Sequence, residues 1–172
     1  ELAGKLQAET AALFIGDGVK EKADDLIGYG ADKVYVVDNA ALKTFQSEVY
    51  LSALDALVKE HKPDILLIGS TRKGRELAAR LATRLETGCV PDCTSLSLDE
   101  QGRLVAERVV YGGNASATHV FLTKPQIACV PLRTFERKLS SVERKGEVVS
   151  VGISQFDAPR IESVEVKPIE AA

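Results

Sequence analysis

The stretch "IGSTRKGRELAARLATRL", residues 68–85, places hydroxyl, glycine and cationic residues between an apolar run and a helical pattern. Its candidate cofactor-binding residues are Ser70, Thr71, Arg72, Gly74 and Arg75. Backbone amides at the start of a helix suit an anion such as a phosphate. Cations in the same turn oppose the helix dipole unless an anion joins them. The turn therefore predicts either an anion site or a hydroxyl helix cap followed by a solvated basic turn.

Other arrangements of reactive side chains are weaker. The turn matches neither the P-loop nor the G-x-G-x-x-G fingerprint, and the G-x-S-x-G pattern of a nucleophile elbow is absent around Ser70. Cys89 and Cys93 are spaced C-x3-C with no second pair, and His61 and His119 lie far from them in the sequence. We therefore expect neither a catalytic residue nor a metal site in this chain.

Composition narrows the class of protein. The chain has 172 residues, of which 45% are hydrophobic and 27% charged, as in one ordinary globular domain. A net charge of −3 lacks the basic excess that is typical of nucleic-acid-binding domains. No apolar run is long enough to cross a membrane. Three cysteines are too few for a disulfide framework, which favours a reducing, cytoplasmic compartment. Methionine is absent even at position 1, so we expect an interior or processed piece of a longer chain.

The elements that must position the turn follow from hydrophobic periodicity. Strands are expected at 10–16, 32–39 and 64–69, and helices at 19–30 and 40–62, with a further helix after 64–69 that carries an apolar face through Leu85. This alternation predicts a three-layer, doubly wound α/β fold with a mainly parallel sheet covered on both faces. Leu77, Leu81 and Leu85 should face that sheet. Residues 1–8 read as the end of a helix, so a strand is expected before Glu1.

The pattern changes after Gly88. Two alternating segments around the turn 99–102 predict an added β-hairpin, and 114–123 predicts a further strand. The apolar segment 126–135 is expected to return to the core sheet. We assign residues 1–152 to the α/β domain, and residues 153–172 to an edge strand and a linker.

Ligands of a doubly wound sheet bind beyond the carboxyl ends of its strands. Besides 69–71, these ends carry the Gly-Asp-Gly turn 16–18, Asp38 with Asn39, and Arg133 with Thr134. The Gly-Asp-Gly sequence favours a tight turn, and Asp38 and Asn39 favour helix caps over ribose ligands.

Four ordered blocks carry a family resemblance. They are "YGADKVYVVDN", "KPDILLIGSTRKGRELAARLATRLETGCVPDCTSL", "RVVYGGNASAT" and "QIACVPLRTFE". Together they look like the N-terminal domain of the electron-transfer flavoprotein alpha subunit, over residues 5–150. The most specific pieces are the G-x-T-x-x-G-R-[DE]-L-A-x-R-x-A run, the Asp-Cys-Thr after it and the Gly-Gly-Asn.

The resemblance implies a domain related to adenine-nucleotide-binding domains that serves mainly as a scaffold and as the interface for a beta subunit. FAD is then held mainly by a separate C-terminal alpha domain and by the beta subunit, with AMP or NAD as further candidate ligands of the complex. The turn 71–75 and the loop with Gly113 and Asn114 are the candidates to face flavin or nicotinamide.

The implied activity is that of an electron carrier rather than an enzyme by itself. It passes electrons from an acyl-CoA dehydrogenase-type flavoenzyme, as in fatty acid β-oxidation, or takes them from NADH in a bifurcating system. A cytoplasmic location is expected, with the mitochondrial matrix as the alternative. A free-standing adenine-nucleotide-binding or hydrolysing domain of the same superfamily remains the second functional hypothesis.

Overall fold

The computed structural model describes residues 1–136 and 144–152, so the predicted edge strand and linker at 153–172 lie outside it. The nine strands of this part are β1 (Ala11–Gly16), β2 (Lys33–Asp38), β3 (Ile65–Gly69), β4 (Cys89–Val90), β5 (Ser95–Leu98), β6 (Leu104–Val110), β7 (Ala115–Val120), β8 (Gln126–Val130) and β9 (Glu147–Ser150). Its α-helices are α1 (Leu2–Leu6), α2 (Ala23–Gly28), α3 (Ser47–His61) and α4 (Arg72–Arg84). Three short 3-10 turns lie at Lys20–Lys22, Ala40–Leu42 and Tyr111–Gly113.

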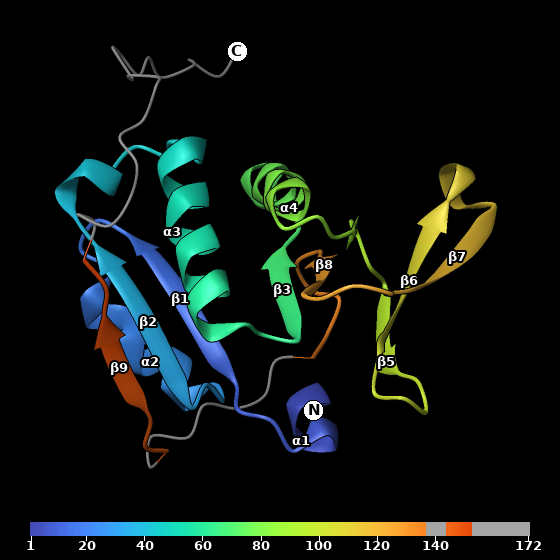
Figure 1. The fold of residues 1–172 in the computed structure, drawn as a ribbon, viewed down its shortest axis with the longest axis horizontal. Coiled ribbons are helices and arrows are strands. Elements are labelled where there is room, and N and C mark those ends of the chain that lie inside the picture. Colours follow the sequence, from blue (N-terminus) through green and yellow to red (C-terminus); the bar gives the residue numbers. More distant parts are fainter. Residues whose placement is uncertain (137–143, 153–172) are drawn as a thin grey trace.

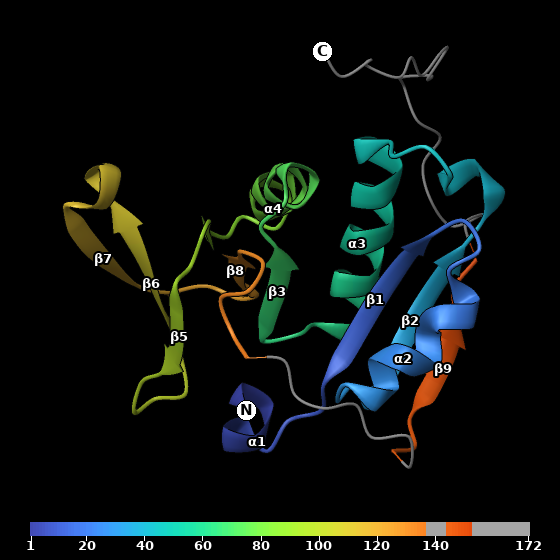
Figure 2. The ribbon, with the colours of Figure 1, turned by 180° about the vertical axis from the view of Figure 1, so that it is seen from behind.

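The strands form two parallel sheets, ordered β1-β2-β9 and β3-β8-β4, and one antiparallel sheet, β5-β6-β7. The two parallel sheets stand beside each other with α3 and α4 above them, and the antiparallel sheet projects from one end (Figure 1). The reverse view shows α2 across the opposite face of β1 and β2 (Figure 2). The predicted α/β class with mostly parallel strands is confirmed.

Alternating side chains of β2 explain the layers. Val34 and Val36 pack with Ala23 and Ile27 of α2, in one buried cluster. Val37 belongs to a second cluster that contains residues of α3. Because successive side chains of a strand point to opposite faces, an almost wholly apolar strand needs a helix on each side.

The helix α4 has the predicted apolar stripe. Leu81 is fully buried among residues of α3 and β8, while Leu77 and Leu85 pack at the margin of the same cluster. Thr71 caps the helix, since its Oγ1 accepts a hydrogen bond from the Gly74 amide at 3.0 Å. The helix is therefore fixed at its start by a hydroxyl and along its length by core packing.

The predicted hairpin is also confirmed. Strands β5 and β6 pair in antiparallel register, and the Asp99 carboxylate accepts hydrogen bonds from the amides of Gln101 and Arg103 in the turn. At the base of β6, the Leu104 amide donates to Gln126 Oε1 at 2.6 Å, which joins the hairpin to β8. The turn and the base of the hairpin are thus held by local bonds.

Three predicted elements have boundaries that differ from the structure. The single helix expected at 40–62 is a 3-10 turn followed by α3, because Gln46 is extended with φ −122°. The helix expected at 19–30 likewise begins as a 3-10 turn. The strand expected at 126–135 ends at Val130, where the chain turns and Arg133 adopts φ 66°.

Strand β9 was not predicted. It pairs in parallel with β2, and the Glu147 amide donates to the Asp32 carbonyl at 2.9 Å as the pairing begins. Arg144 reaches the Asp32 carboxylate at 2.5 Å just before the strand. Residues 147–151 read Glu-Val-Val-Ser-Val, so the segment is rich in the β-branched residues that favour a strand, and the edge of β2 supplies its partner.

Candidate functional site

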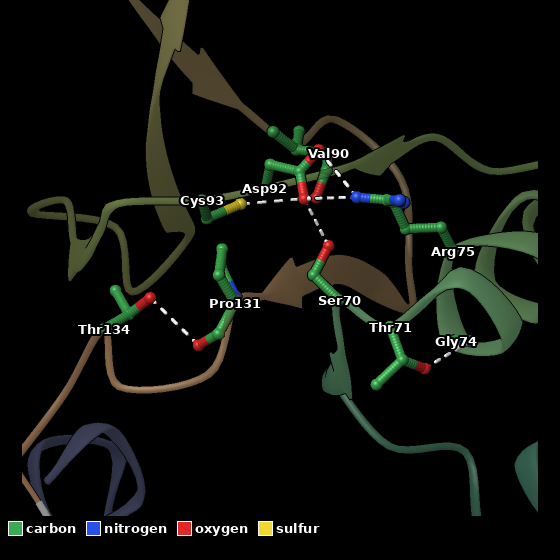
Figure 3. Close-up of polar contacts among 9 residues, drawn as sticks. All are labelled: Ser70, Thr71, Gly74, Arg75, Val90, Asp92, Cys93, Pro131 and Thr134. Atoms are coloured by element: carbon green, nitrogen blue, oxygen red, sulfur yellow. Dashed lines mark hydrogen bonds and ion pairs between the residues drawn. The ribbon is translucent and has the colours of Figure 1, made fainter. Parts of the chain in front are cut away.

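Polar side chains meet where β3 and β4 end. Ser70 Oγ donates to Asp92 Oδ1 at 2.5 Å, and Arg75 Nη1 donates to the same oxygen at 3.1 Å (Figure 3). Ser70 follows β3, Arg75 lies in the first turn of α4, and Asp92 follows β4. One cation of the predicted turn, Arg75, therefore does bind an anion, and that anion is a carboxylate of the same chain.

The position of Asp92 is set by its backbone. Asp92 adopts φ 54°, and the next residue is anchored because the Cys93 amide donates to the Cys129 carbonyl at 2.9 Å. The hydrogen bond from Ser70, followed by the bond and charge of Arg75, holds the pKa of the Asp92 carboxyl below its usual value. Asp92 thus stays ionised at neutral pH and can partner the cation.

Gly74 has a packing role at this turn. A Cβ on Gly74 would lie 2.0 Å from the carbonyl oxygen of Gly69, the last residue of β3. Only a residue without a side chain allows the helix to start so close to the strand. Together with the cap by Thr71, this accounts for two of the predicted binding residues without a ligand.

The neighbouring cations are less constrained. Arg72 is exposed, and within residues 1–136 and 144–152 no hydrogen bond or ion pair of its side chain is found. Lys73 Nζ lies 4.8 Å from the centroid of the Phe45 ring, a cation–π contact. Arg72 is therefore the cation of this turn that remains available to another molecule.

At the carboxyl ends of β1 and β2, a carboxylate of the same chain again binds nearby hydrogen-bond donors. The Asp38 carboxylate accepts hydrogen bonds from the amides of Gly18 and Lys20, at 2.8 and 2.9 Å. Asn39 Oδ1 accepts from the Ala41 amide at 2.9 Å, so its predicted role as a cap is confirmed. Asp38 binds the Gly-Asp-Gly turn rather than capping a helix, and a carboxylate of the chain again occupies amides that could hold a phosphate.

Gly113 and Asn114 lie elsewhere. They follow β6 at the end of the β6–β7 pair, which extends away from α4 in both ribbon views (Figures 1 and 2). Tyr111, Gly112 and Gly113 have φ of 51°, 63° and 102°, and Asn114 Nδ2 donates to the Tyr111 carbonyl at 2.8 Å. The two glycines provide a left-handed turn, and this chain alone does not bring them to Ser70.

Arg133 and Thr134 form a separate turn after β8. Thr134 Oγ1 donates to the Pro131 carbonyl at 2.9 Å, apart from the Asp92 contacts (Figure 3). This bond closes the turn locally, and neither residue has a bond to Ser70, Arg75 or Asp92 within the described segments.

The antiparallel sheet exposes apolar side chains. Tyr111 is 83% exposed and Leu122 88%, and Val109 and Val120 are also exposed. On the inner face of the same sheet, Arg108 Nε and His119 Nε2 are buried without a hydrogen-bond partner among the described residues. Exposed apolar groups gathered in one region are typical of a surface that another chain covers.

The cysteines show no sign of thiolate chemistry. Burial raises the pKa of Cys89 and Cys93, and raises that of Cys129 to about 12, so all three thiols stay protonated at neutral pH. Cys93 Sγ donates to the Val90 carbonyl at 3.2 Å. Across the described segments, no group of three or more potential ligands is placed to hold a metal ion, and no helix is long and apolar enough to cross a membrane.

Sequence reasoning missed Asp92 as the partner of this turn. The residue stands in the Asp-Cys-Thr piece of the resemblance, yet nothing in its local sequence says that it contacts Ser70, 22 positions earlier. The signal that could have identified Asp92 is an acidic residue just after the strand that follows the cationic helix in the chain.

Comparisons with known proteins agree on one family. The model described as "Electron transfer flavoprotein domain" matches residues 1–156. The electron transfer flavoprotein subunit alpha of Thermoanaerobacterium thermosaccharolyticum is 42% identical over 164 residues, covering 95% of this chain and 48% of the relative. Protein FixB of Azorhizobium caulinodans is 41% identical over 134 residues, which are 76% of this chain and 36% of that protein.

A third relative is named for a different reaction. It is the lactate dehydrogenase (NAD(+),ferredoxin) subunit LctC of Acetobacterium woodii, 37% identical over 170 residues that make up 98% of this chain and 40% of the relative. The chain spans about half the length, or less, of each of these relatives. The match of the family model over most of the chain shows that it belongs to the electron transfer flavoprotein family.

Proposed function

We propose that this chain is part of the alpha-type subunit of a heterodimeric electron-transfer flavoprotein. The complex carries electrons between flavin dehydrogenases of the acyl-CoA dehydrogenase type and other redox partners, in the cytoplasm. Within it, the domain described here serves as a scaffold and as the interface for the beta subunit. Family membership supports the electron-transfer role, and the geometry of the strand ends supports the scaffold role.

The observation that carries the scaffold role is the pairing of donors at the strand ends. Asp92 takes the hydroxyl of Ser70 and the guanidinium of Arg75, and Asp38 takes two amides of the first turn. A phosphate of FAD, AMP or NAD would have to displace these carboxylates and leave them without partners. The residues of this domain therefore do not fit a resident dinucleotide, and we assign FAD to other parts of the complex.

We assign the contact with the beta subunit to residues 93–122. This segment contains the exposed apolar side chains of Val109, Tyr111, Val120 and Leu122. An obligate interface of this kind should bury more than roughly 2,000 Å² and contain many apolar contacts.

Co-expression of the complete subunit with its beta subunit tests the assembly. We expect a stable complex that purifies with a flavin spectrum, whereas the 172-residue chain alone should be colourless. Binding of ATP or AMP by the chain alone, with no affinity for the beta subunit, would support the free-standing nucleotide-binding domain instead.

Matched variants test the contact surface. Tyr111→Asp and Leu122→Asp should abolish co-purification of the beta subunit, because each buries a charge at the proposed interface. Leu132→Asp is the control, since Leu132 is equally exposed at 83% but lies outside residues 93–122. Loss of the complex only in the Leu132 variant would move the interface to the turn after β8.

The electron donor needs its own measurement. The flavin of the purified complex should be reduced by an acyl-CoA dehydrogenase with its substrate. Reduction by NADH alone would instead favour a NAD-linked system, since the Acetobacterium woodii relative is named as a subunit of a NAD(+)- and ferredoxin-linked dehydrogenase.

A further inference from the structure

Strand β7 pairs on one side only. Among the described residues it is hydrogen-bonded to β6, and no other strand borders it. It lies at the outer border of the molecule in both ribbon views, where no described element lies beyond it (Figures 1 and 2). The sheet β5-β6-β7 therefore ends in an open edge along β7.

The register identifies the backbone groups on this edge. The Asp99 amide donates to the Arg103 carbonyl at 3.0 Å, so Arg103 points its backbone groups toward β5. Because these groups alternate along an antiparallel strand, the even-numbered residues of β6 bond to β7. Their partners are the odd-numbered residues of β7, for example Ala117 opposite Arg108. The free N–H and C=O groups of the edge therefore belong to the other residues of β7, which are Ser116, Thr118 and Val120.

The outer half of the β6–β7 pair has no third strand. β5 pairs with β6 only from Leu104 to Glu107, whereas β7 pairs with β6 from Val105 to Val110. The last three residues of β6 therefore form a two-stranded ribbon with β7, and such a ribbon is marginally stable in water. A further strand on β7 would give this part of the sheet three strands.

β7 lacks the features that protect natural sheet edges. Its six residues, "ASATHV", contain no lysine, arginine, carboxylate or proline. By contrast, the edge strand β5 is only four residues long, and the edge strand β9 begins with Glu147, whose carboxylate lies 3.5 Å from the Lys33 ammonium. A six-residue edge without charge or proline is a template for pairing with another chain.

The side chains beside this edge are apolar and exposed. Val109 and Val120 lie on one face of the β6–β7 pair, and they are 50% and 43% exposed. Tyr111 and Leu122 lie just beyond the two ends of β7 and are more exposed still. A segment that pairs with the edge can therefore gain apolar contacts in addition to main-chain hydrogen bonds.

We propose that an extended segment of the beta subunit adds to the free edge of β7 as a fourth strand of this sheet. The proposal rests on the proposed function, which assigns residues 93–122 to the contact with that subunit, and it names the way in which the two chains pair. The backbone groups of Ser116, Thr118 and Val120 bind the segment. The segment needs about six extended residues, with apolar side chains at the alternate positions that face Val109 and Val120.

A pair of variants separates the backbone of β7 from its side chains. Thr118→Pro removes the outward N–H, and proline is tolerated in an edge strand where the N–H faces solvent. We expect the affinity for the beta subunit to be at least about tenfold weaker in Thr118→Pro. Thr118→Ala keeps the N–H and should bind within about threefold of the parent. Thermal unfolding of each free subunit checks that both variants fold.

Residue-resolved hydrogen exchange of the parent subunit gives a second test that needs no substitution. In the complex, the amides of Ser116, Thr118 and Val120 should exchange at least about tenfold more slowly than in the free subunit. The amides of Ala117 and His119, which already bond to β6, should change less. Slowing that alternates along β7 is the result expected for an added strand.

Three results would overturn the added strand and leave the proposed interface in place. The first is parent affinity in Thr118→Pro while Tyr111→Asp abolishes binding. The second is an equal loss of affinity in Thr118→Pro and Thr118→Ala, which would assign the contact to the Thr118 side chain. The third is equal slowing of both sets of amides, which would show that the beta subunit covers the hairpin without pairing with it.

Two other results would contradict more than the added strand. Unchanged exchange throughout residues 93–122 of the complex would contradict the proposed interface as well. Slow exchange of the edge-facing amides in the free subunit that is lost on dilution, together with a dimer by light scattering, would show that a second copy of the chain occupies the edge.

Discussion

The turn between β3 and α4 and the far end of the β6–β7 pair both combine glycine with polar residues, but they differ in completeness. At the turn, Ser70 and Arg75 both bind Asp92 of the same chain. At the β6–β7 end, the Tyr111 side chain is exposed. Three residues earlier on β6, the Nε atom of Arg108 is buried and has no hydrogen-bond partner among the described residues. The comparison teaches that a motif with the composition of a ligand site can be satisfied within the chain, whereas the hairpin, with no such motif, leaves large apolar side chains exposed.

The largest effect is expected in the packed body that supports the turn. Leu81→Ala, at a fully buried position, should destabilise the complete subunit by about 2–5 kcal/mol, because it leaves a cavity between α3, α4 and β8. Leu122→Ala, at an exposed position of the hairpin, should change stability by less than about 0.5 kcal/mol. Denaturant unfolding of both variants compares the two regions directly, and equal losses would contradict the contrast.

Gly74→Ala should have the next largest effect. The new Cβ meets the backbone oxygen of Gly69, which cannot move aside as a flexible side chain would, so we expect a loss of about 1–3 kcal/mol. Gly88→Ala is the matched control, because a Cβ there has nothing within 4 Å. A stability change in Gly74→Ala no larger than in the control would mean that the helix does not start against β3.

The pH dependence of stability should report the Asp92 contacts. Because the folded state lowers the pKa of Asp92, its contribution is fully present above the unfolded value near 3.9 and is lost as pH falls through the lower folded value. For this partly exposed pair we expect about 1 kcal/mol or less. The stability difference between the parent and Asp92→Asn should therefore shrink in strong acid and be constant from about pH 5 to 7. A constant difference down to pH 2 would contradict the assignment.

Arg72 and Arg75 should differ in the sign of a smaller effect. Arg75→Ala breaks the ion pair with Asp92 and should cost up to about 1 kcal/mol. Arg72→Ala removes a cation that opposes the helix dipole and should be neutral or stabilising by about 0.3–1 kcal/mol. The same comparison includes the flavin affinity of the complex. A tenfold weaker flavin affinity in the Arg72→Ala complex would indicate that this turn contacts the cofactor.

The parts of the fold with local signals were predictable. The apolar runs before Gly16 and Gly69 indicated buried strands, the turn 99–102 indicated the hairpin, and the hydroxyl of Thr71 indicated the helix start. Each of these depends on neighbouring residues alone. Local chemistry therefore fixed most strands and one helix cap.

The rest depends on contacts between distant segments. Ser70 and Asp92 meet only because β3 and β4 both pair with β8. The strand β9 forms because the edge of β2 accepts it, and α3 begins late because Gln46 is extended. Periodicity in one segment contains no information about these partners.

Hydrogen exchange of the complete subunit, measured alone and in complex with its beta subunit, tests the contrast between the two regions most directly. We predict slower exchange in residues 93–122 of the complex and little change in residues 70–75, where the amides of Ser70, Thr71, Gly74 and Arg75 already have partners in the chain. Protection of residues 70–75 with unchanged exchange in residues 93–122 would contradict the account.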